Sequence, residues 1–178
     1  NNISVNKDLK EEALMRTKKI LFVCTGNTCR SPMAEASLRR ELKRRKITGF
    51  SVRSAGLSVG EGSTLSPNSA QALKEAKITV LKSFRPRQLT DKMVKESLLV
   101  VCMTERHREK LSQYRNVTSF YELCGREIPD PYGLNIDAYR VTLRRIRECI
   151  PRVIDVIVQM SSQEENTVPS KGTQGGLS

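Results

Sequence analysis

The sequence predicts a single α/β domain in which a parallel sheet is covered by helices on both faces. Short continuous apolar runs, typical of buried strands, alternate with segments whose apolar residues recur every three or four positions. Strands that alternate with helices in this way pair in parallel, because each helix returns the chain to the same end of the sheet. A chain of 178 residues has room for one such domain with its own core.

The first elements are a leader, a strand and a helix. Residues 1–17 are polar, and we expect at most a turn of helix over 11–15. The apolar run 20–23 is typical of a strand buried on both faces. Pro32 then suits the first turn of a helix, whose apolar stripe is Ala34, Leu38 and Leu42. Further strands are expected over 51–53, 98–103 and 117–120, and further helices over 66–77, 91–96 and 104–113.

The last helix has the clearest periodicity. Its apolar residues step by threes and fours and therefore share one face; they are Tyr139, Leu143, Ile146, Ile150, Val153 and Ile157. Pro151 is expected to kink or interrupt this helix. Residues 161–178 have the composition of a disordered tail, which leaves 18–160 as the folded domain.

Composition narrows the classes of function. No apolar run approaches the ~20 residues that a membrane helix needs, and residues 1–16 lack the apolar centre of a secretory signal, so we expect a cytoplasmic protein without a membrane partner. The net charge of +12 attracts anionic partners, but only 4% of the residues are aromatic, so we expect no nucleic-acid partner. We interpret the basic runs 39–40 and 43–46 as a solvated helix face.

The cysteines do not predict a disulfide framework or a metal site. Their number is five, none forms a CxxC pair, and the chain has a single histidine, so we expect no metal and no cofactor. Cys102, Cys124 and Cys149 lie in apolar or amphipathic surroundings and are expected to be small core residues. His107 lies among charged residues, and we expect it on the surface of a helix without a functional role.

The loop after the first strand carries the chemistry. It reads CTGNTCRSP and separates Cys24 from Arg30 by five residues. A tight loop that runs into a helix directs successive backbone N–H groups at one point and binds anions. Gly26 and Asn27 tolerate the positive φ that such a loop requires. Arg30 can add two hydrogen bonds to a phosphate, and Ser31 can donate to the Cys24 sulfur and stabilise its thiolate.

This pattern has an ordinary alternative. A cysteine and an arginine separated by five residues occur often by chance, as a buried cysteine at a strand end and a solvent-facing arginine. The preceding strand, the Gly-Asn pair and the Ser-Pro start of a helix favour the phosphate-binding interpretation.

The longer string CTGNTCRSPMAE resembles the signature of the low-molecular-weight protein tyrosine phosphatases. The resemblance extends over about 18–159, with further matching segments at 54–56, 87–89 and 128–133. It implies a four-stranded parallel sheet with flanking helices, no metal, and an intermediate in which Cys24 carries the phosphoryl group.

The resemblance also implies roles for individual residues. The phosphate-binding loop would comprise Thr25, Gly26, Asn27, Thr28, Cys29, Arg30 and Ser31. Asp130, between two prolines, would protonate the leaving group and then activate the water that hydrolyses the intermediate. Asn27 and Ser54 would hold the loop through side-chain hydrogen bonds. Many relatives add a histidine to this network where the chain has Lys74–Lys77, so we expect a less complete support.

The expected substrate is phosphoarginine in proteins. Tyrosine-directed members of the family usually have isoleucine at the position of Thr28, whereas members similar to protein arginine phosphatases have threonine. The carboxylate of Asp130 could pair with a guanidinium group, and Tyr132 is a second expected specificity residue. Phosphotyrosine in proteins is the alternative substrate.

Two other functions fit less well. An arsenate reductase would need two further cysteines just after the third strand, and residues 104–113 contain none. A phosphate-binding adaptor without activity would usually have lost Cys24 or Asp130, and both are present. Cys29 could form a reversible disulfide with oxidised Cys24, or it could be only a small buried side chain.

Overall fold

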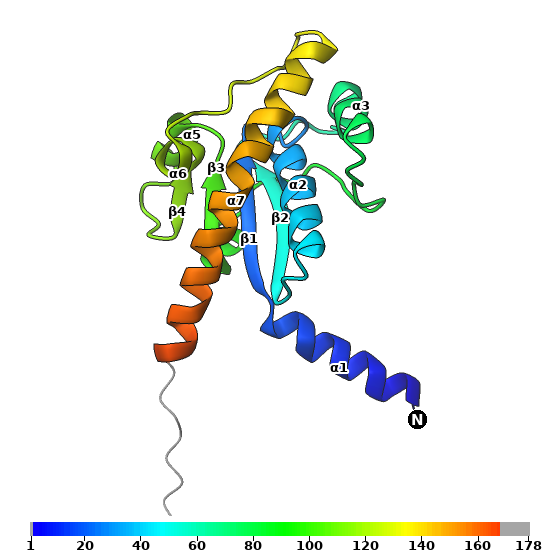
Figure 1. Ribbon diagram of the computed structural model, residues 1–178, viewed down its shortest axis with the longest axis vertical. Coiled ribbons are helices and arrows are strands. Elements are labelled where there is room, and N and C mark those ends of the chain that lie inside the picture. Colours follow the sequence, from blue (N-terminus) through cyan, green and yellow to red (C-terminus); the bar gives the residue numbers. More distant parts are fainter. Residues whose placement is uncertain (1, 168–178) are drawn as a thin grey trace, which may run out of the picture.

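Helices and strands alternate along the chain, in a computed structural model that describes residues 2–167 (Figure 1). The elements in order are α1 (Asn2–Arg16), β1 (Lys18–Cys24), α2 (Arg30–Arg44), β2 (Phe50–Gly56), α3 (Pro67–Glu75), α4 (Asp91–Lys95), β3 (Ser97–Cys102), α5 (Glu105–Glu109), β4 (Val117–Ser119), α6 (Phe120–Cys124) and α7 (Ile136–Thr167).

The four strands form one parallel sheet in the order β2-β1-β3-β4. In its register Cys24 pairs with Gly56, and Val23 pairs with Cys102. The carboxyl ends of the three longer strands therefore meet at one edge, where the arrowheads point in Figure 1. The predicted fold class, a four-stranded parallel sheet between helices, is confirmed, and the loop after β1 lies at the edge where such folds bind ligands.

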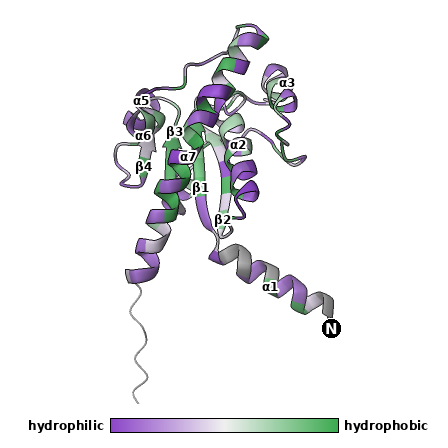
Figure 2. Ribbon diagram, viewed as in Figure 1, coloured by the Kyte–Doolittle hydropathy of each residue, from purple (hydrophilic) through white to green (hydrophobic). Residues whose placement is uncertain are grey.

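Two hydrophobic cores cover the two faces of the sheet. Ile20 and Phe22 of β1 pack in the larger core with α2, α3 and α7, whereas Leu21 and Val23 pack in a smaller core that includes Leu111. Figure 2 shows hydrophobic colouring along β3 and hydrophobic segments alternating with hydrophilic ones along α7. Full burial of one such side chain stabilises the fold by about 1.5–3 kcal/mol, so the two cores hold β1 rigidly beneath its loop.

Helix α7 is longer than the sequence predicted. Pro151 lies inside it without ending it, and the apolar stripe listed above is buried as expected. The helix continues to Thr167, so the expectation of disorder is wrong for residues 161–167. The Nζ atom of Lys18 donates to the carbonyl of Ser161 at 3.0 Å and pairs with Glu164 at 3.3 Å, which fastens this end of the helix to β1. The rest of the predicted tail, 168–178, lies outside the described residues.

The leader forms a full helix, α1, rather than a single turn, and this helix projects away from the sheet (Figure 1).

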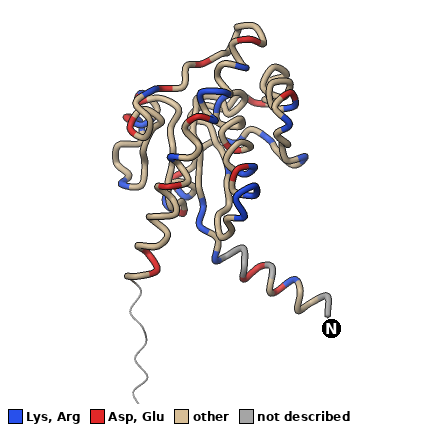
Figure 3. Tube along the Cα trace, viewed as in Figure 1, with Lys and Arg blue, Asp and Glu red and all other residues tan. Residues whose placement is uncertain are grey.

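Basic residues gather on the second half of α2 (Figure 3). Arg44 and Arg45 on this face both bond to Glu41, which agrees with a solvated helix surface. Among residues 2–167, none of the helices combines the length and the apolar character that crossing a bilayer requires.

Cys124 and Cys149 form a disulfide, so the expectation that both are free core residues is wrong. The bond joins α6 to α7 with 6.1 Å between the two Cα atoms. Helix α6 was not predicted because it is only one turn long; Gly125, in the left-handed conformation with φ 73°, ends it. Closing a loop with the observed separation of 25 residues stabilises the fold by about 3 kcal/mol in the chain-entropy model.

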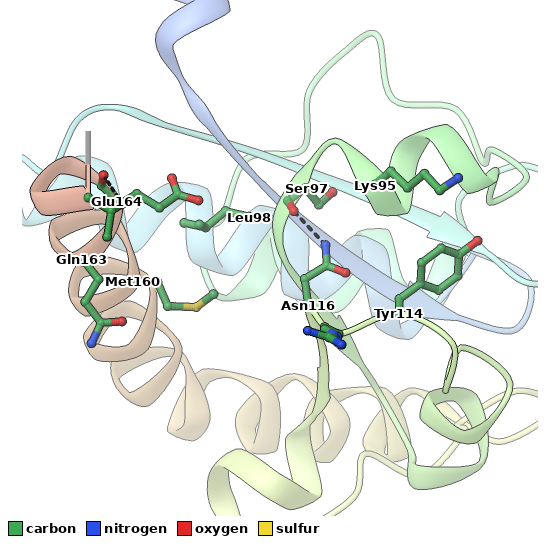
Figure 4. Close-up of a pocket in the computed structure, with 10 residues that line it drawn as sticks. Lys95, Ser97, Leu98, Tyr114, Asn116, Met160, Gln163 and Glu164 are labelled. Carbon is green, nitrogen blue, oxygen red and sulfur yellow. Dashed lines mark hydrogen bonds between the residues drawn. The ribbon is translucent and has the colours of Figure 1, made fainter. Parts of the chain in front are cut away.

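A cavity of about 600 Å³ lies at the opposite edge of the sheet, where β3 begins (Figure 4). Asn116 closes part of its wall by donating to the carbonyls of Val94 and Ser97, each at 2.8 Å. The end of α7 forms another side through Met160 and Glu164. The amide of Asn116 is thus already engaged within the protein, and the residues with reactive side chains in the sequence motif lie at the other edge.

Candidate active site

The loop between β1 and α2 brings Cys24 and Arg30 into the interior. Cys24 ends β1, and Arg30 begins α2. Only 2% of the Cys24 surface and 4% of the Arg30 surface is exposed. The ordinary interpretation of the motif, with a solvent-facing arginine, is therefore wrong.

Asn27 fixes the shape of the loop. Its φ is +55°, and its side chain is fully buried. The backbone N–H of Arg87 donates to Asn27 Oδ1 at 3.0 Å, which sets the orientation of the amide. Asn27 Nδ2 then donates to Ser31 Oγ and to Ser54 Oγ, both at 2.9 Å. The expected bonds of Asn27 and Ser54 are therefore present, and a backbone donor between α3 and α4 adds a partner for Asn27.

The Cys24 sulfur lies 2.9 Å from Ser31 Oγ, and both atoms are buried. Because Asn27 already donates to the Ser31 oxygen, the hydroxyl hydrogen of Ser31 is free to point at the sulfur. The hydrogen bonds thus run in series from Asn27 through Ser31 to the sulfur of Cys24.

Gly56 lets the end of β2 pack directly on the loop backbone. A Cβ atom at this position would lie 2.6 Å from the carbonyl oxygen of Thr25 and 3.0 Å from the backbone nitrogen of Asn27. The next two residues hold the loop from the same side: Leu57 N–H donates to the Cys24 carbonyl at 3.0 Å, and Ser58 N–H donates to the Thr25 carbonyl at 2.9 Å.

Replacing Gly56 by alanine should therefore displace the loop. Because two of the three close atoms belong to the loop backbone and the third is Val59 Cγ2 at 2.7 Å, we expect a loss of about 1–3 kcal/mol of folding free energy and clearly weaker binding of inorganic phosphate. Thermal unfolding and calorimetric phosphate titration would measure the two effects. Gly60→Ala is the control, since its Cβ would meet only the side chain of Ser63; equal behaviour of the two variants would contradict the close contact.

Arg30 connects the loop to the segment that carries Asp130. Its Nη1 donates to the carbonyl of Ile128 at 3.1 Å, and its Nη2 lies 3.4 Å from Asp130 Oδ2. Its Nε is buried and has no hydrogen-bond partner among residues 2–167. A buried guanidinium donor without a partner is costly, and a bound anion such as phosphate would satisfy it.

Asp130 is held in place but accessible. Its Oδ1 accepts from the backbone N–H of Tyr132 at 3.1 Å, and its side chain is 49% exposed. The side chain of Tyr132 is 77% exposed and free to contact a large partner. The structure therefore brings the guanidinium of Arg30 and the carboxylate of Asp130 together, and Cys24 lies at the start of the loop that ends at Arg30.

The second half of the loop packs against α3 and α7. The carbonyl of Thr28 accepts from Ser66 N–H at 2.9 Å, and the Cys29 sulfur lies 3.5 Å from the hydroxyl of Tyr139. Cys24 and Cys29 are both free thiols, and Cys29 is buried. Formation of a disulfide between them stays a prediction. Burial raises the pKa of the third free thiol, Cys102, to about 12, which makes it inert.

His107 is buried, with 5% of its surface exposed. The expectation that it lies on the surface of a helix is therefore wrong. Its Nε2 lies 3.0 Å from Thr25 Oγ1 in the loop. The neighbours of His107 in the sequence are charged, and α5 is only one turn long, so no apolar pattern indicated which side of the helix is buried. A usable signal was position alone: residues just after β3 reach the same edge of the sheet as the loop after β1.

Several known proteins are similar to this chain in sequence and in fold. The family model for low molecular weight phosphotyrosine protein phosphatases matches residues 19–166. A protein-arginine-phosphatase of Bacillus subtilis is 33% identical, over 74% of this chain and 91% of its own length. The low molecular weight protein-tyrosine-phosphatase PtpB of Staphylococcus haemolyticus is 34% identical, over 72% and 91%.

A solved structure agrees with this assignment. It is that of the YwlE arginine phosphatase in a mutant form with a phosphorylated active site serine. It is 29% identical and superimposes with a TM-score of 0.69, covering 84% of this chain and 97% of the other. The family suggested by the loop motif is confirmed: the chain is an enzyme that belongs to the low molecular weight phosphotyrosine protein phosphatases.

Proposed function

We propose that this phosphatase removes the phosphoryl group from phosphoarginine in proteins, with Cys24 as nucleophile and Asp130 as proton donor. The observation that carries the proposal is the position of Arg30. Its guanidinium lies 3.4 Å from the Asp130 carboxylate, and its buried Nε has no partner among residues 2–167. A phosphoryl group that satisfies Nε would lie between the sulfur and the acid.

In the first step, the Cys24 sulfur attacks phosphorus. The S–P bond forms while the P–N bond to the guanidino group breaks, and Asp130 gives its proton to the departing nitrogen. Without that proton the leaving group would be a poor anion. The backbone N–H groups of the loop and Arg30 stabilise the charge on the phosphoryl oxygens.

In the second step, water attacks the phosphocysteine. Asp130, now a carboxylate, takes the proton from the water as the new O–P bond forms. The S–P bond breaks and its electron pair returns to the sulfur, where the Ser31 hydroxyl at 2.9 Å stabilises the thiolate. Inorganic phosphate leaves, and the starting state is restored without a metal or cofactor.

The choice of phosphoarginine rests on two side chains. Thr28 is half-buried and offers a hydroxyl beside the loop, where an aliphatic side chain would favour a phenyl ring. Asp130 is exposed enough to pair with a planar guanidinium. Phosphorylated proteins of the cytoplasm are the substrates that this proposal implies.

A panel of phosphopeptides tests this choice. We expect higher kcat/KM for phosphoarginine than for phosphotyrosine peptides, and we expect Thr28→Ile to shift the ratio toward phosphotyrosine by roughly tenfold, the size of effect that one side-chain contact exerts on specificity. Thr28→Ser, which keeps the hydroxyl, is the matched control. Tyrosine activity that equals or exceeds arginine activity, and that Thr28→Ile leaves unchanged, would contradict the arginine assignment.

A further inference from the structure

The mechanism above does not use the buried imidazole of His107, which contacts the phosphate-binding loop. We propose that His107 is a positioning residue that holds the side chain of Thr25 so that the Thr25 hydroxyl donates to the substrate beside the nucleophile. This inference rests on the proposed function, since it concerns the substrate side of the same loop.

The surroundings of the ring indicate which nitrogen carries the hydrogen. His107 Nδ1 is buried and has no hydrogen-bond partner within the described part of the chain, whereas Nε2 lies 3.0 Å from Thr25 Oγ1. A buried N–H without an acceptor is rarer in proteins than an unsatisfied acceptor. The hydrogen therefore belongs on Nε2, and the ring donates to the Thr25 oxygen.

The ring stays neutral at physiological pH. Burial, and next the positive charge of Arg30, lower the pKa of His107 to about 4. Lys110 and Arg106 lower it further, and only Asp130 opposes them.

Both partners are fixed at their backbones. Thr104 accepts from His107 N–H at 3.3 Å at the start of α5, and Met103 N–H donates to the Val23 carbonyl at 3.0 Å. The Thr25 carbonyl accepts from Ser58 N–H at 2.9 Å. What remains free is the rotation of the exposed Thr25 side chain, and the bond from His107 selects one orientation of it.

The hydroxyl of Thr25 then has one hydrogen left to donate. Since its oxygen accepts from His107, this hydrogen points away from the ring. Thr25 directly follows the nucleophile in the chain and is exposed to solvent. A donor at this place would contact the phosphoryl group or its leaving atom, and a donor held in one orientation binds better than a rotating one.

Four variants test the proposal through kcat and KM on a phosphoarginine peptide. Thr25→Val removes the hydroxyl and keeps the shape, and His107→Asn has an amide too short to replace Nε2. We expect each to lower kcat/KM by about fivefold to tenfold, the worth of one hydrogen bond, and the double variant to lose no more than either. His107→Gln can place its amide nitrogen near Nε2 and should restore most of the activity.

The controls separate positioning from folding. Glu109→Gln changes an exposed residue of the same helix and should behave like the parent protein. Thr25→Val alters a surface side chain, so it tests the hydroxyl even where a His107 variant folds poorly. Full activity of Thr25→Val, additive losses in the double variant, or equal activity of His107→Gln and His107→Asn would overturn the proposal.

A spectroscopic test does not depend on turnover. His107 is the single histidine of the chain, so nitrogen NMR of protein labelled at histidine reports on this ring alone. We expect a neutral ring protonated at Nε2 throughout the range from about pH 6 to pH 8, within which an ordinary histidine titrates. A hydrogen on Nδ1 would overturn the inference, whereas absence of hydrolysis in the parent protein would refute the proposed function and leave this test standing.

Discussion

Replacing Cys24 by serine should abolish hydrolysis of phosphorylated peptides and leave phosphate binding almost intact. A serine hydroxyl is not ionised at neutral pH and is a far weaker nucleophile than a thiolate. The substitution keeps the size of the side chain and the contact with Ser31 at 2.9 Å. We expect kcat to fall by about 10⁴-fold or more, as for other enzymes that lose their nucleophile.

The two halves of this expectation need separate measurements. Steady-state release of phosphate gives kcat, and calorimetric titration with inorganic phosphate gives the affinity that Arg30 and the loop supply. Cys102→Ala is the matched control, because Cys102 is also buried but lies within β3 and has an inert thiol. Activity above about one hundredth of the parent value in the serine variant would place the nucleophile elsewhere.

Replacing Asp130 by asparagine should slow the reaction most for poor leaving groups. The single oxygen of asparagine can still accept from Tyr132 N–H, which should keep the segment in shape, whereas the contact of Oδ2 with Arg30 is lost. It has no proton to transfer, and general acid catalysis contributes about 10²–10⁴-fold. We therefore expect a loss of this size with a phosphoarginine peptide and a much smaller loss with an activated aryl phosphate, whose leaving group needs no proton.

The ratio of the two losses is the informative quantity. It is obtained from kcat/KM for both substrates in the parent protein and in the variant. Asp137→Asn is a suitable control, because Asp137 is exposed and pairs with Arg140 on α7. Equal losses with both substrates would show that the residue acts on binding or structure and not as the proton donor.

The sequence was sufficient for the parts of the site that depend on local pattern. A buried strand, a left-handed Asn27 and a proline in the first turn of α2 are encoded within about ten neighbouring residues, so the loop could be located directly. The approach of Asp130 to Arg30 is a contact across 100 positions, and it came from the family resemblance. No periodicity in the chain would have predicted it.

The features that were missed depend on tertiary placement. His107 is buried because the short α5 turns one side toward the loop, and a helix of five residues has too little periodicity to reveal which side. The hydrogen bond from Arg87 to Asn27 is donated by a backbone N–H, which is present in every residue except proline. The residue type at position 87 therefore could not predict this bond. The extension of α7 to Thr167 depends on Lys18, far away in sequence.

The bond between Cys124 and Cys149 has a consequence for the segment that contains Asp130. The intervening chain is a closed covalent ring, and its exposed part includes Tyr132 and Leu134. A protease that cut this exposed stretch would open the ring without releasing a fragment, since both new ends would remain linked through sulfur. The cut chain would separate into two pieces only after a reductant had been added.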